Sequence, residues 1–299
     1  MKYCCAGIVL FNPEIDRLTE NIAAIKKQVN KIILIDNNSN NSDLILKEYE
    51  QSEEFIIVKN NENKGIATAL NQICEIAEKN EYEWVLLLDQ DSVCSPNLIE
   101  SYQKHISDES VALLTPYIID INKLSFDEYS ELKLSETSAV NWAITSGSLI
   151  RLRTWEEVGR FYDDLFIDAV DIDYSIRLKL NGYKQIRVNR EYLLQEVGHA
   201  EPTCIVRPHK DNSGKWTIKR YYRSNHSLLR QYYMTRNNII IARKYSQYIP
   251  MIKSLSFTML MSLPKPFVEK NKFKLLYSLI RGFKDGFKFK VIKYISNKH

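Results

Sequence analysis

Two aspartates at the end of an apolar run have the type and spacing that metal and phosphate chemistry requires. The hydrophobic residues 84–88 are followed directly by Asp89, Gln90 and Asp91. Such a run predicts a buried parallel strand, and open α/β sheets bind ligands beyond the carboxyl ends of their strands. Carboxylates at that edge can hold a hard divalent cation against a phosphate group. Because Asp also favours turns, the pair taken alone is equally compatible with a solvated turn.

A second acidic cluster lies in residues 166–173, where Asp168, Asp171 and Asp173 precede or begin a predicted helix. The partial positive charge of a helix N-terminus favours carboxylates, so capping is one explanation. The functional alternative is that one carboxylate acts as a general base and takes a proton from a hydroxyl group. Three acids in six residues exceed what capping requires, which favours the functional interpretation.

The surrounding pattern predicts the elements that position these acids. Apolar runs at 3–11, 31–35, 55–58 and 83–88 predict strands, and the segments between them have helical spacing or polar turns. This alternation indicates a parallel sheet with helices on its faces. Right-handed crossovers then bring Asp36, the loop 63–65 and Asp89 to one edge. There Asp36 could accept a hydrogen bond from a base, and Gly65 could allow close backbone approach to a nucleotide, although turn formation explains each residue singly.

Beyond residue 110 the predicted strands and helices no longer alternate regularly. We expect strands at 111–114 and 143–150, helices at 172–180 and 227–246, and a loop or hairpin at 201–225. The apolar segment 251–263 is too short to span a bilayer, which needs about 20 residues. Further apolar residues recur near helical spacing in the segment 273–295, namely Phe273, Leu276, Ile280, Phe283, Phe287 and Tyr294.

Charge is distributed unevenly along the 299 residues. The net charge is +4, yet residues 243–299 hold 13 Lys or Arg and 2 Asp or Glu, which leaves 28 basic and 35 acidic residues before them. A basic amphipathic helix suits an anionic membrane surface, while packing on the catalytic domain or on a second subunit is the alternative. Gly282 and Gly286 would permit close approach of a partner helix. No nucleic-acid-binding motif accompanies the tail. Five cysteines without zinc spacing, and the absence of a signal-peptide pattern, favour a cytoplasmic setting.

Taken together, these motifs resemble the inverting family 2 glycosyltransferases of GT-A fold, and within them the bacterial rhamnosyltransferase branch. The resemblance covers roughly residues 3–245. It is carried by Asn63-Lys64-Gly65 with Asn71, Asp89-Gln90-Asp91-Ser92, Thr145-Ser146-Gly147-Ser148, residues 168–177 with Gly182-Tyr183, and the helix 230–237. It implies an α/β GT-A domain over 1–245, a Rossmann-like nucleotide-binding sheet with an acceptor-side subdomain, and C-terminal helices in the basic tail 246–299.

The resemblance also implies roles for individual residues. Asp171 would be the catalytic base, and Asp89 and Asp91 would hold the ribose and a Mg²⁺ or Mn²⁺ ion on the diphosphate. The family often carries a metal-binding His before a Gly near the end of this domain. Here Gln195 stands at that place, and His199, just after the Gly, is the candidate metal ligand. The remaining assignments are Phe11, Asp36, Asn38, Asn63, Gly65, Gln90, Ser146, Gly147 and Arg236 for the nucleotide-sugar, and Asp168, Asp173 and Trp142 for the acceptor side.

The function implied is metal-dependent transfer of a sugar, L-rhamnose from dTDP-rhamnose, to a hydroxyl of a lipid-linked glycan acceptor in cell-surface polysaccharide synthesis. The tail places this work at the inner face of the cell membrane, and a homodimer is also compatible with it. One alternative is a UDP-hexose or UDP-N-acetylhexosamine transferase of the same fold, and another is an inactive membrane-associated scaffold. A sugar nucleotidyltransferase is disfavoured, because Phe11-Asn12-Pro13-Glu14 bears no likeness to a phosphate-binding loop.

Overall fold

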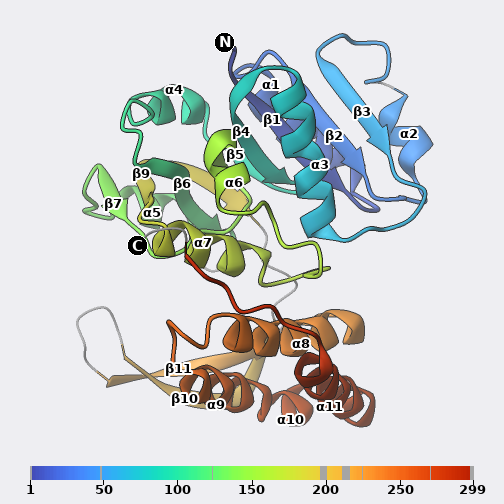
Figure 1. Ribbon diagram of the computed structural model, residues 1–299, viewed down its shortest axis with the longest axis vertical. Helices are drawn as coiled ribbons and strands as arrows, with labels where there is room; N and C mark the ends of the chain where they lie inside the picture. Colours follow the sequence, from blue (N-terminus) through green and yellow to red (C-terminus); the bar gives the residue numbers. More distant parts are fainter. Residues whose placement is uncertain are drawn as a thin grey trace. The chain divides into compact units, whose positions relative to one another are not determined.

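The computed structural model describes residues 2–47, 49–122, 124–195, 201–210, 216–223, 225–269 and 271–296. The chain divides into two compact units, Met1–Glu196 with Ser296–His299 and Val197–Ile295. In Figure 1 the N-terminal part of the first unit is coloured blue to yellow and the second unit gold to red. The helix before residue 245 packs with the tail helices in the second unit. The domain boundary expected at residue 245 stays a prediction.

The first unit is built on one mixed sheet with the strand order β3-β2-β1-β4-β8-β6-β9-β5, and β7 pairs with β9 beside this path. Strands β1 to β4 are parallel to one another, β8 runs antiparallel to β4 and β6, and β6 and β9 are parallel. The strands are β1 (Lys2–Leu10), β2 (Ile32–Asp36), β3 (Phe55–Lys59), β4 (Tyr82–Asp89), β5 (Val93–Cys94), β6 (Val111–Asp120), β7 (Thr137–Ala139), β8 (Ser148–Arg151) and β9 (Lys184–Gln195).

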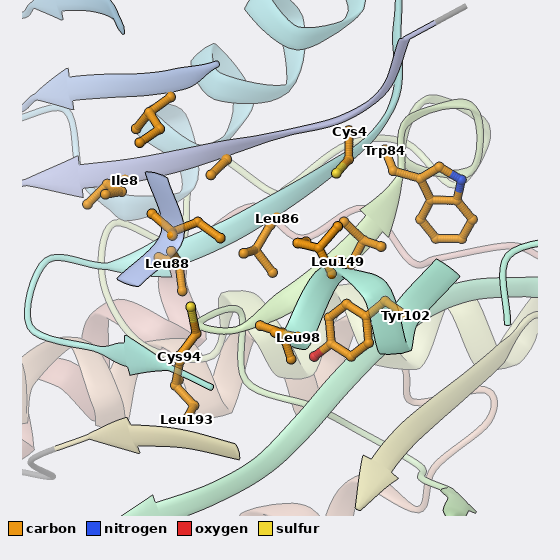
Figure 2. Packing of buried hydrophobic residues seen from close by; sticks show 14 of the residues in the cluster. Cys4, Ile8, Trp84, Leu86, Leu88, Cys94, Leu98, Tyr102, Leu149 and Leu193 are labelled. Atoms are coloured by element: carbon orange, nitrogen blue, oxygen red, sulfur yellow. The ribbon is translucent and has the colours of Figure 1, made fainter. Parts of the chain in front are cut away.

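Helices cover both faces of the parallel half, as the alternating pattern predicts. Helix α1 packs Leu18, Ile22 and Ile25 on one face, in the cluster that also holds alternate residues of β1 and β4 (Figure 2). Each such fully buried side chain contributes about 1.5–3 kcal/mol. Helix α3 lies on the other face, where Ile73 occupies the space in front of Gly7. The helices of this unit are α1 (Ile15–Lys26), α2 (Ser42–Leu46), α3 (Ile66–Lys79), α4 (Leu98–Gln103), α5 (Phe126–Ser130), α6 (Leu152–Glu157) and α7 (Val170–Leu180).

The strand expected at 143–150 is shorter than the apolar pattern indicates. Only residues from Ser148 onwards join the sheet, as β8. Gly147 has a left-handed backbone with φ of 77°, which is incompatible with an extended strand. Its N–H donates to the carbonyl of Leu87 at 2.7 Å, so the chain turns onto the end of β4 at this point.

In the second unit, the described residues form a hairpin and four helices. Strands β10 (Glu201–Lys210) and β11 (Trp216–Arg223) are antiparallel, as expected for 201–225. The helices are α8 (Leu228–Lys244), α9 (Met251–Ser262), α10 (Lys265–Val268) and α11 (Lys272–Lys288). No helix among the described residues has the length and apolar character needed to cross a membrane.

Two glycines allow α11 to pack closely on α8. A Cβ atom added at Gly282 would lie 2.6 Å from the Tyr232 carbonyl oxygen, and one at Gly286 would lie 2.9 Å from that of Arg236. Real Cβ atoms do not approach backbone oxygens so closely. The prediction that these glycines permit a close helix contact is therefore confirmed, and the partner helix is α8.

Candidate active site

The carboxyl ends of β1, β2 and β4 lie at one edge of the sheet. In the parallel register Leu10 lies opposite Asp36, and Val9 lies opposite Asp89. Phe11 follows β1 at the same edge, and its side chain is exposed. The prediction that Asp36 and Asp89 share an edge is confirmed, and it follows from the order of strands alone.

Asp36 shapes the turn that follows β2. Its side chain is 2% exposed, and its two carboxylate oxygens accept the Ser39 N–H at 3.2 and 3.3 Å. Within this turn Asn38 adopts a left-handed backbone with φ of 68°. The turn explanation for both residues is thus correct, and binding of a base by Asp36, or of the donor by Asn38, stays a prediction.

Asp89 is held from three directions. Its N–H donates to Ser146 Oγ at 2.9 Å, its carbonyl accepts Asn21 Nδ2 at 2.6 Å, and its Oδ2 accepts Gln195 Nε2 at 3.0 Å. Neighbouring elements therefore fix both the backbone and the carboxylate. A carboxylate held in this way needs little reorganisation when a cation or a ribose hydroxyl binds.

Three residues assigned to the donor support this edge of the sheet from within the fold. Ser146 is buried, and its hydroxyl pairs with the Asp89 N–H and with Ser92 Oγ at 2.9 Å. Gly147 is buried, and a Cβ atom added to it would lie 2.9 Å from Pro116 Cγ. The Gln90 amide bridges to the Phe11 backbone, as acceptor from its N–H at 2.8 Å and as donor to its carbonyl at 3.3 Å. These contacts show that all three residues support the sheet edge, and their contact with the donor stays a prediction.

Asp89 and Asp91 have the chemistry of a magnesium or manganese site. Both are half-buried and supply hard oxygen donors at the sheet edge. Mg²⁺ keeps several waters and is commonly bound by one or two carboxylates together with substrate phosphates. Among the described residues no group of three or more His, Cys, Asp or Glu could hold a metal by itself. Two carboxylates therefore fit an ion that arrives with a diphosphate, since the part of the chain that the structure describes supplies no larger cluster of metal ligands.

The metal ligand expected at His199 lies outside the described residues. Gln195, one position before them, is the residue that the structure brings to the site. Its amide donates to Asp89 Oδ2 at 3.0 Å. The sequence signal for Gln195 was its place in the motif, where the resembling family carries a His, but its contact with Asp89 could not be read from the pattern.

The loop Asn63-Lys64-Gly65 is built on the neighbouring turn. Asn63 Oδ1 accepts the Gly65 N–H at 2.9 Å, and Asn37 Nδ2 donates to the Gly65 carbonyl at 3.1 Å. Asn37 Oδ1 also accepts the Lys64 N–H at 3.3 Å. Because Asn37 follows Asp36 directly, this loop lies at the same edge as the acids. Donor binding by Asn63 and Gly65 stays a prediction.

Gly65 also connects this edge to the second acidic cluster. The Ile66 N–H donates to the Phe166 carbonyl at 2.8 Å, and a Cβ on Gly65 would lie 2.6 Å from that same oxygen. With φ of 82°, Gly65 adopts a backbone that other residues rarely take. The segment that leads to Asp168 therefore lies directly on the start of α3, at a position that only glycine fits.

Asn71 fixes the same segment further along α3. Its Nδ2 donates to the Phe161 carbonyl and to Asp163 Oδ1, each at 2.9 Å. Its Oδ1 accepts the Phe161 N–H at 2.9 Å and Trp155 Nε1 at 3.1 Å. One buried side chain thus makes four hydrogen bonds with residues 155–163. The place of Asn71 in the sequence motif is explained by this anchoring.

The chain reaches α7 through two strained residues. Asp168 and Ala169 have φ of 66° and 67°, a left-handed conformation that costs roughly 1–2 kcal/mol for each residue with a side chain. Such strain persists where the surrounding contacts determine the backbone, and it is concentrated at functional sites. Here it places Asp171 in the first turn of α7.

Asp171 has the properties of a general base. Its side chain is half-buried, and Oδ1 accepts the Ile172 N–H at 2.9 Å. Burial raises the pKa of Asp171 from 3.8 to about 6, and the negative charge of Asp168 contributes in the same direction. A pKa just below neutrality leaves the carboxylate ionised at physiological pH and more basic than an ordinary Asp. Of the three acids in this cluster, Asp171 fits the base best.

Asp173 is buried in an ion pair within the first unit. It is 0% exposed and forms an ion pair with Arg177 at 2.8 Å, while Arg177 Nη1 donates to the Val158 carbonyl at 2.7 Å. Residues two apart on a helix point in directions about 200° apart, so Asp171 and Asp173 lie on different faces of α7. In this structure Asp173 belongs to a buried ion pair, and an acceptor-side role for it stays a prediction.

Two further assignments stay predictions. Trp142 is 56% exposed in the loop before β8, and the next residue, Ala143, donates its N–H to Ser175 Oγ of α7 at 3.3 Å. Arg236 belongs to the second unit, where its guanidinium lies 4.8 Å from the Phe289 ring centroid and 5.8 Å from that of Tyr233. These positions leave an acceptor role for Trp142 and a phosphate role for Arg236 untested.

Comparison with known proteins identifies the family. Residues 5–163 match the model of the family Glycosyl transferase family 2. The chain belongs to this family. The fold is that of GT-A glycosyltransferases, so the predicted family and fold class are both confirmed. The protein is therefore a glycosyltransferase.

The individual relatives have low sequence identity to this chain. The dTDP-rhamnosyl transferase RfbF of Shigella flexneri is 26% identical over 84% of this chain and 82% of its own length. The poly-beta-1,6-N-acetyl-D-glucosamine synthase of Staphylococcus aureus is 29% identical over 57% of this chain and 43% of its own. Among solved structures, GalNAc-T7 with UDP, GalNAc and Mn²⁺ has a TM-score of 0.63 at 14% identity, over 96% of this chain and 56% of that one. TarS 1–349 of S. aureus, in complex with UDP-GlcNAc, has a TM-score of 0.58 at 14% identity, over 96% and 81%.

Proposed function

We propose that this glycosyltransferase transfers L-rhamnose from dTDP-β-L-rhamnose to a hydroxyl of a glycan acceptor, with inversion at the anomeric carbon. The choice of donor rests on the similarity to a protein named dTDP-rhamnosyl transferase, which extends over 84% of the chain. The observation that carries the reaction is the arrangement of two sets of acids. Asp89 and Asp91 lie at the sheet edge. Asp171 follows a segment whose Phe166 carbonyl accepts a hydrogen bond from the Ile66 N–H at the start of α3.

The mechanism we propose is a single displacement. The acceptor oxygen attacks the anomeric carbon, the bond from that carbon to the diphosphate oxygen breaks, and the nucleotide diphosphate leaves with the bonding electrons. The Asp171 carboxylate accepts the proton of the hydroxyl, which is worth about 10²–10⁴-fold in rate. Its pKa of about 6 keeps it ionised and ready to accept this proton. A protein nucleophile is not needed in this scheme.

We further propose that Asp89 and Asp91 hold a Mg²⁺ or Mn²⁺ ion with the diphosphate of the donor. The ion would offset the negative charge that develops on the leaving group. Support comes from the oxygen donor set at the sheet edge, and from a structural relative crystallised with UDP and Mn²⁺. The paired Ser146 and Gln195 contacts would keep Asp89 in place while donor and ion enter and leave.

A second candidate is transfer from a UDP-hexose or UDP-N-acetylhexosamine. It is favoured by the two structural relatives that contain UDP or UDP-GlcNAc, and by the S. aureus synthase among the sequence relatives. An inactive scaffold is the least favoured alternative, because both acidic clusters are present and Asp171 has a base-like pKa. We also propose that the acceptor is lipid-linked and that the enzyme works at the inner face of the cell membrane, where a homodimer would be compatible.

One experiment tests the proposed donor against the two alternatives. The protein is incubated with dTDP-rhamnose, UDP-glucose, UDP-galactose or UDP-N-acetylglucosamine, with Mn²⁺ or Mg²⁺, and release of the nucleotide diphosphate is followed. We expect dTDP-rhamnose to be consumed, and dTDP with Mn²⁺ to raise the melting temperature more than UDP with Mn²⁺. Consumption of a UDP-sugar alone would establish the second candidate, and stabilisation by no nucleotide would favour the scaffold.

A further inference from the structure

Helix α11 has two apolar stripes, and the described part of its own unit covers one of them. Leu275, Leu279, Gly282 and Gly286 recur at helical spacing and are buried, and the two glycines lie against α8. The second stripe, formed by Leu276, Ile280, Phe283 and Phe287, has the same spacing and is displaced by one residue. One residue corresponds to about 100° around a helix, so the second stripe lies on a different face.

This second stripe remains largely exposed. Ile280 is 58% exposed, and Phe273, one turn before Leu276, is 88% exposed. Phe283 is half-buried, and its ring centroid lies 5.8 Å from that of Phe287. These are the residues whose spacing first predicted an amphipathic helix. The structure shows that the first stripe, which contains the two glycines, packs on α8. The second stripe is therefore available to a partner.

The neighbouring helices also expose large apolar side chains. Helix α10 contacts both α9 and α11, and the large apolar side chains of α9 are mostly exposed. They include Ile252, Phe257 and Leu260, while Phe267 of α10 is exposed as well. Soluble monomers rarely expose contiguous apolar patches of more than a few hundred Å², and larger ones mark interaction sites. We call the exposed apolar residues of α9, α10 and α11 the apolar face.

The charges near the apolar face are mostly positive. Lys272, Lys274, Lys284 and Lys288 are all exposed on α11. The sole acid of this helix, Asp285, accepts the Tyr232 hydroxyl at 2.8 Å and lies 3.6 Å from Arg281. An apolar stripe flanked by lysines suits a helix lying in the interface of an anionic bilayer, because lysine stems can reach the headgroups while the aromatic rings insert.

We propose that the apolar face of α9, α10 and α11 is a docking surface for an anionic lipid bilayer. A second copy of this chain fits less well. A two-fold dimer joins the same patch on both subunits, so the lysines of one α11 would face those of the other. Like charges opposed in this way disfavour association, whereas anionic lipid attracts them. The inference rests on the proposed function in one respect, since a lipid-linked acceptor gives such docking its purpose.

The test is sedimentation of the full chain with vesicles of phosphatidylcholine containing about 30% phosphatidylglycerol, compared with phosphatidylcholine alone. We expect binding to the anionic vesicles, and its loss in about 0.5 M salt, because salt screens charges near the surface. Each lysine near the surface is worth about fivefold in partitioning, so the double variant K284Q/K288Q should bind more than tenfold less.

Matched variants distinguish vesicle binding through the apolar face from nonspecific vesicle binding. Ile280→Glu should abolish vesicle binding, whereas Ile218→Glu, on β11 and 78% exposed in the wild type, should leave it unchanged. Thermal melts check that each variant is folded. Equal binding by wild type and Ile280→Glu, or no binding by the wild type, would overturn the proposal. A dimer by light scattering that Ile280→Glu dissociates, without vesicle binding, would instead assign the face to a second copy.

Nucleotide binding is measured on the same samples by thermal melts with dTDP or UDP and Mn²⁺. Vesicle binding without nucleotide stabilisation would contradict the proposed function and leave the docking surface standing. Nucleotide stabilisation without vesicle binding would contradict the docking surface and leave the proposed function standing. The two failures are therefore distinguishable.

Discussion

Replacing Asp171 by Asn tests the proposed base, because it removes the charge and keeps the shape. We expect two effects from this one change. Transfer should slow by about 10²–10⁴-fold, the range that general-base catalysis supplies. The folded protein should become more stable at neutral pH, because a partly buried carboxylate is replaced by a neutral amide.

The magnitude and the sign of the second effect follow from the pKa. A pKa raised from 3.8 to about 6 corresponds to at most about 3 kcal/mol against the charged form in the folded state. The folded state holds the proton more tightly than the unfolded chain does. The contribution of Asp171 to stability is therefore full below about pH 4 and is lost as the pH rises through about 6. The Asn variant does not titrate, so its advantage over the wild type should grow over that interval.

Melting temperatures of the wild type and Asp171→Asn at about pH 4.5 and pH 8 measure this difference. At pH 8 the variant should melt several degrees higher, and at pH 4.5 this difference should shrink to about a third, because the loss runs from about pH 4 to about pH 6. Asp16→Asn is the matched control, an exposed acid in the first turn of α1, and should show neither effect. The reasoning is refuted if the Asn variant turns over at the wild-type rate, or if its melting temperature difference is independent of pH.

The same pKa sets the pH dependence of the wild-type reaction. The rate kcat/KM should fall below about pH 6, as Asp171 becomes protonated. Asp168→Asn removes the negative charge that helps to raise this pKa, so the acidic limb should move to lower pH. An unchanged limb in that variant would mean that a different group limits the rate.

Three further predictions concern the surroundings of the base and of the metal site. Gly65→Ala should destabilise the protein by more than about 2 kcal/mol and lower activity, because its Cβ would meet the Phe166 carbonyl at 2.6 Å. Gly159→Ala, also at positive φ but with its nearest contact at 3.7 Å, should cost less in melting temperature and spare activity. Gln195→Ala should weaken Mn²⁺ binding about 10–100-fold, measured by titration of nucleotide-dependent stabilisation, because Asp89 loses a fixed partner. Chelation by EDTA should abolish release of nucleotide diphosphate, and added Mn²⁺ or Mg²⁺ should restore it; activity that persists in EDTA would exclude the proposed metal.

The parallel half of the sheet and one edge of the site were predictable from the sequence. The strands there are uninterrupted apolar runs, which distinguishes them from the amphipathic helices between them. Once that alternation is recognised, the handedness of crossovers places Asp36 and Asp89 on the same side. No tertiary contact has to be known for this inference, and the register confirms it.

The direction of polar side chains was not predictable, because it depends on partners distant in sequence. Ser146 is 57 residues from Asp89, and Gln195 is 106 residues from it, yet both bond it directly. The burial of Asp173 could have been anticipated, since Arg177 lies four residues later on the same helix and can form an ion pair with it. The motif pattern pointed to a functional role for Asp173, and its position on the helix pointed to the ion pair with Arg177.

The donor edge and the proposed base belong to one connected network. Gly65 and Ile66 contact Phe166, and Asn71 binds the segment before it, so α3 supports the chain up to the strained Asp168 and Ala169. Two left-handed residues cost roughly 2–4 kcal/mol together, which these contacts must offset. A change at Asn71 would therefore act on Asp171 without touching a substrate. Because the same helix begins at the loop assigned to the donor, movement of that loop on nucleotide binding would also reach the base.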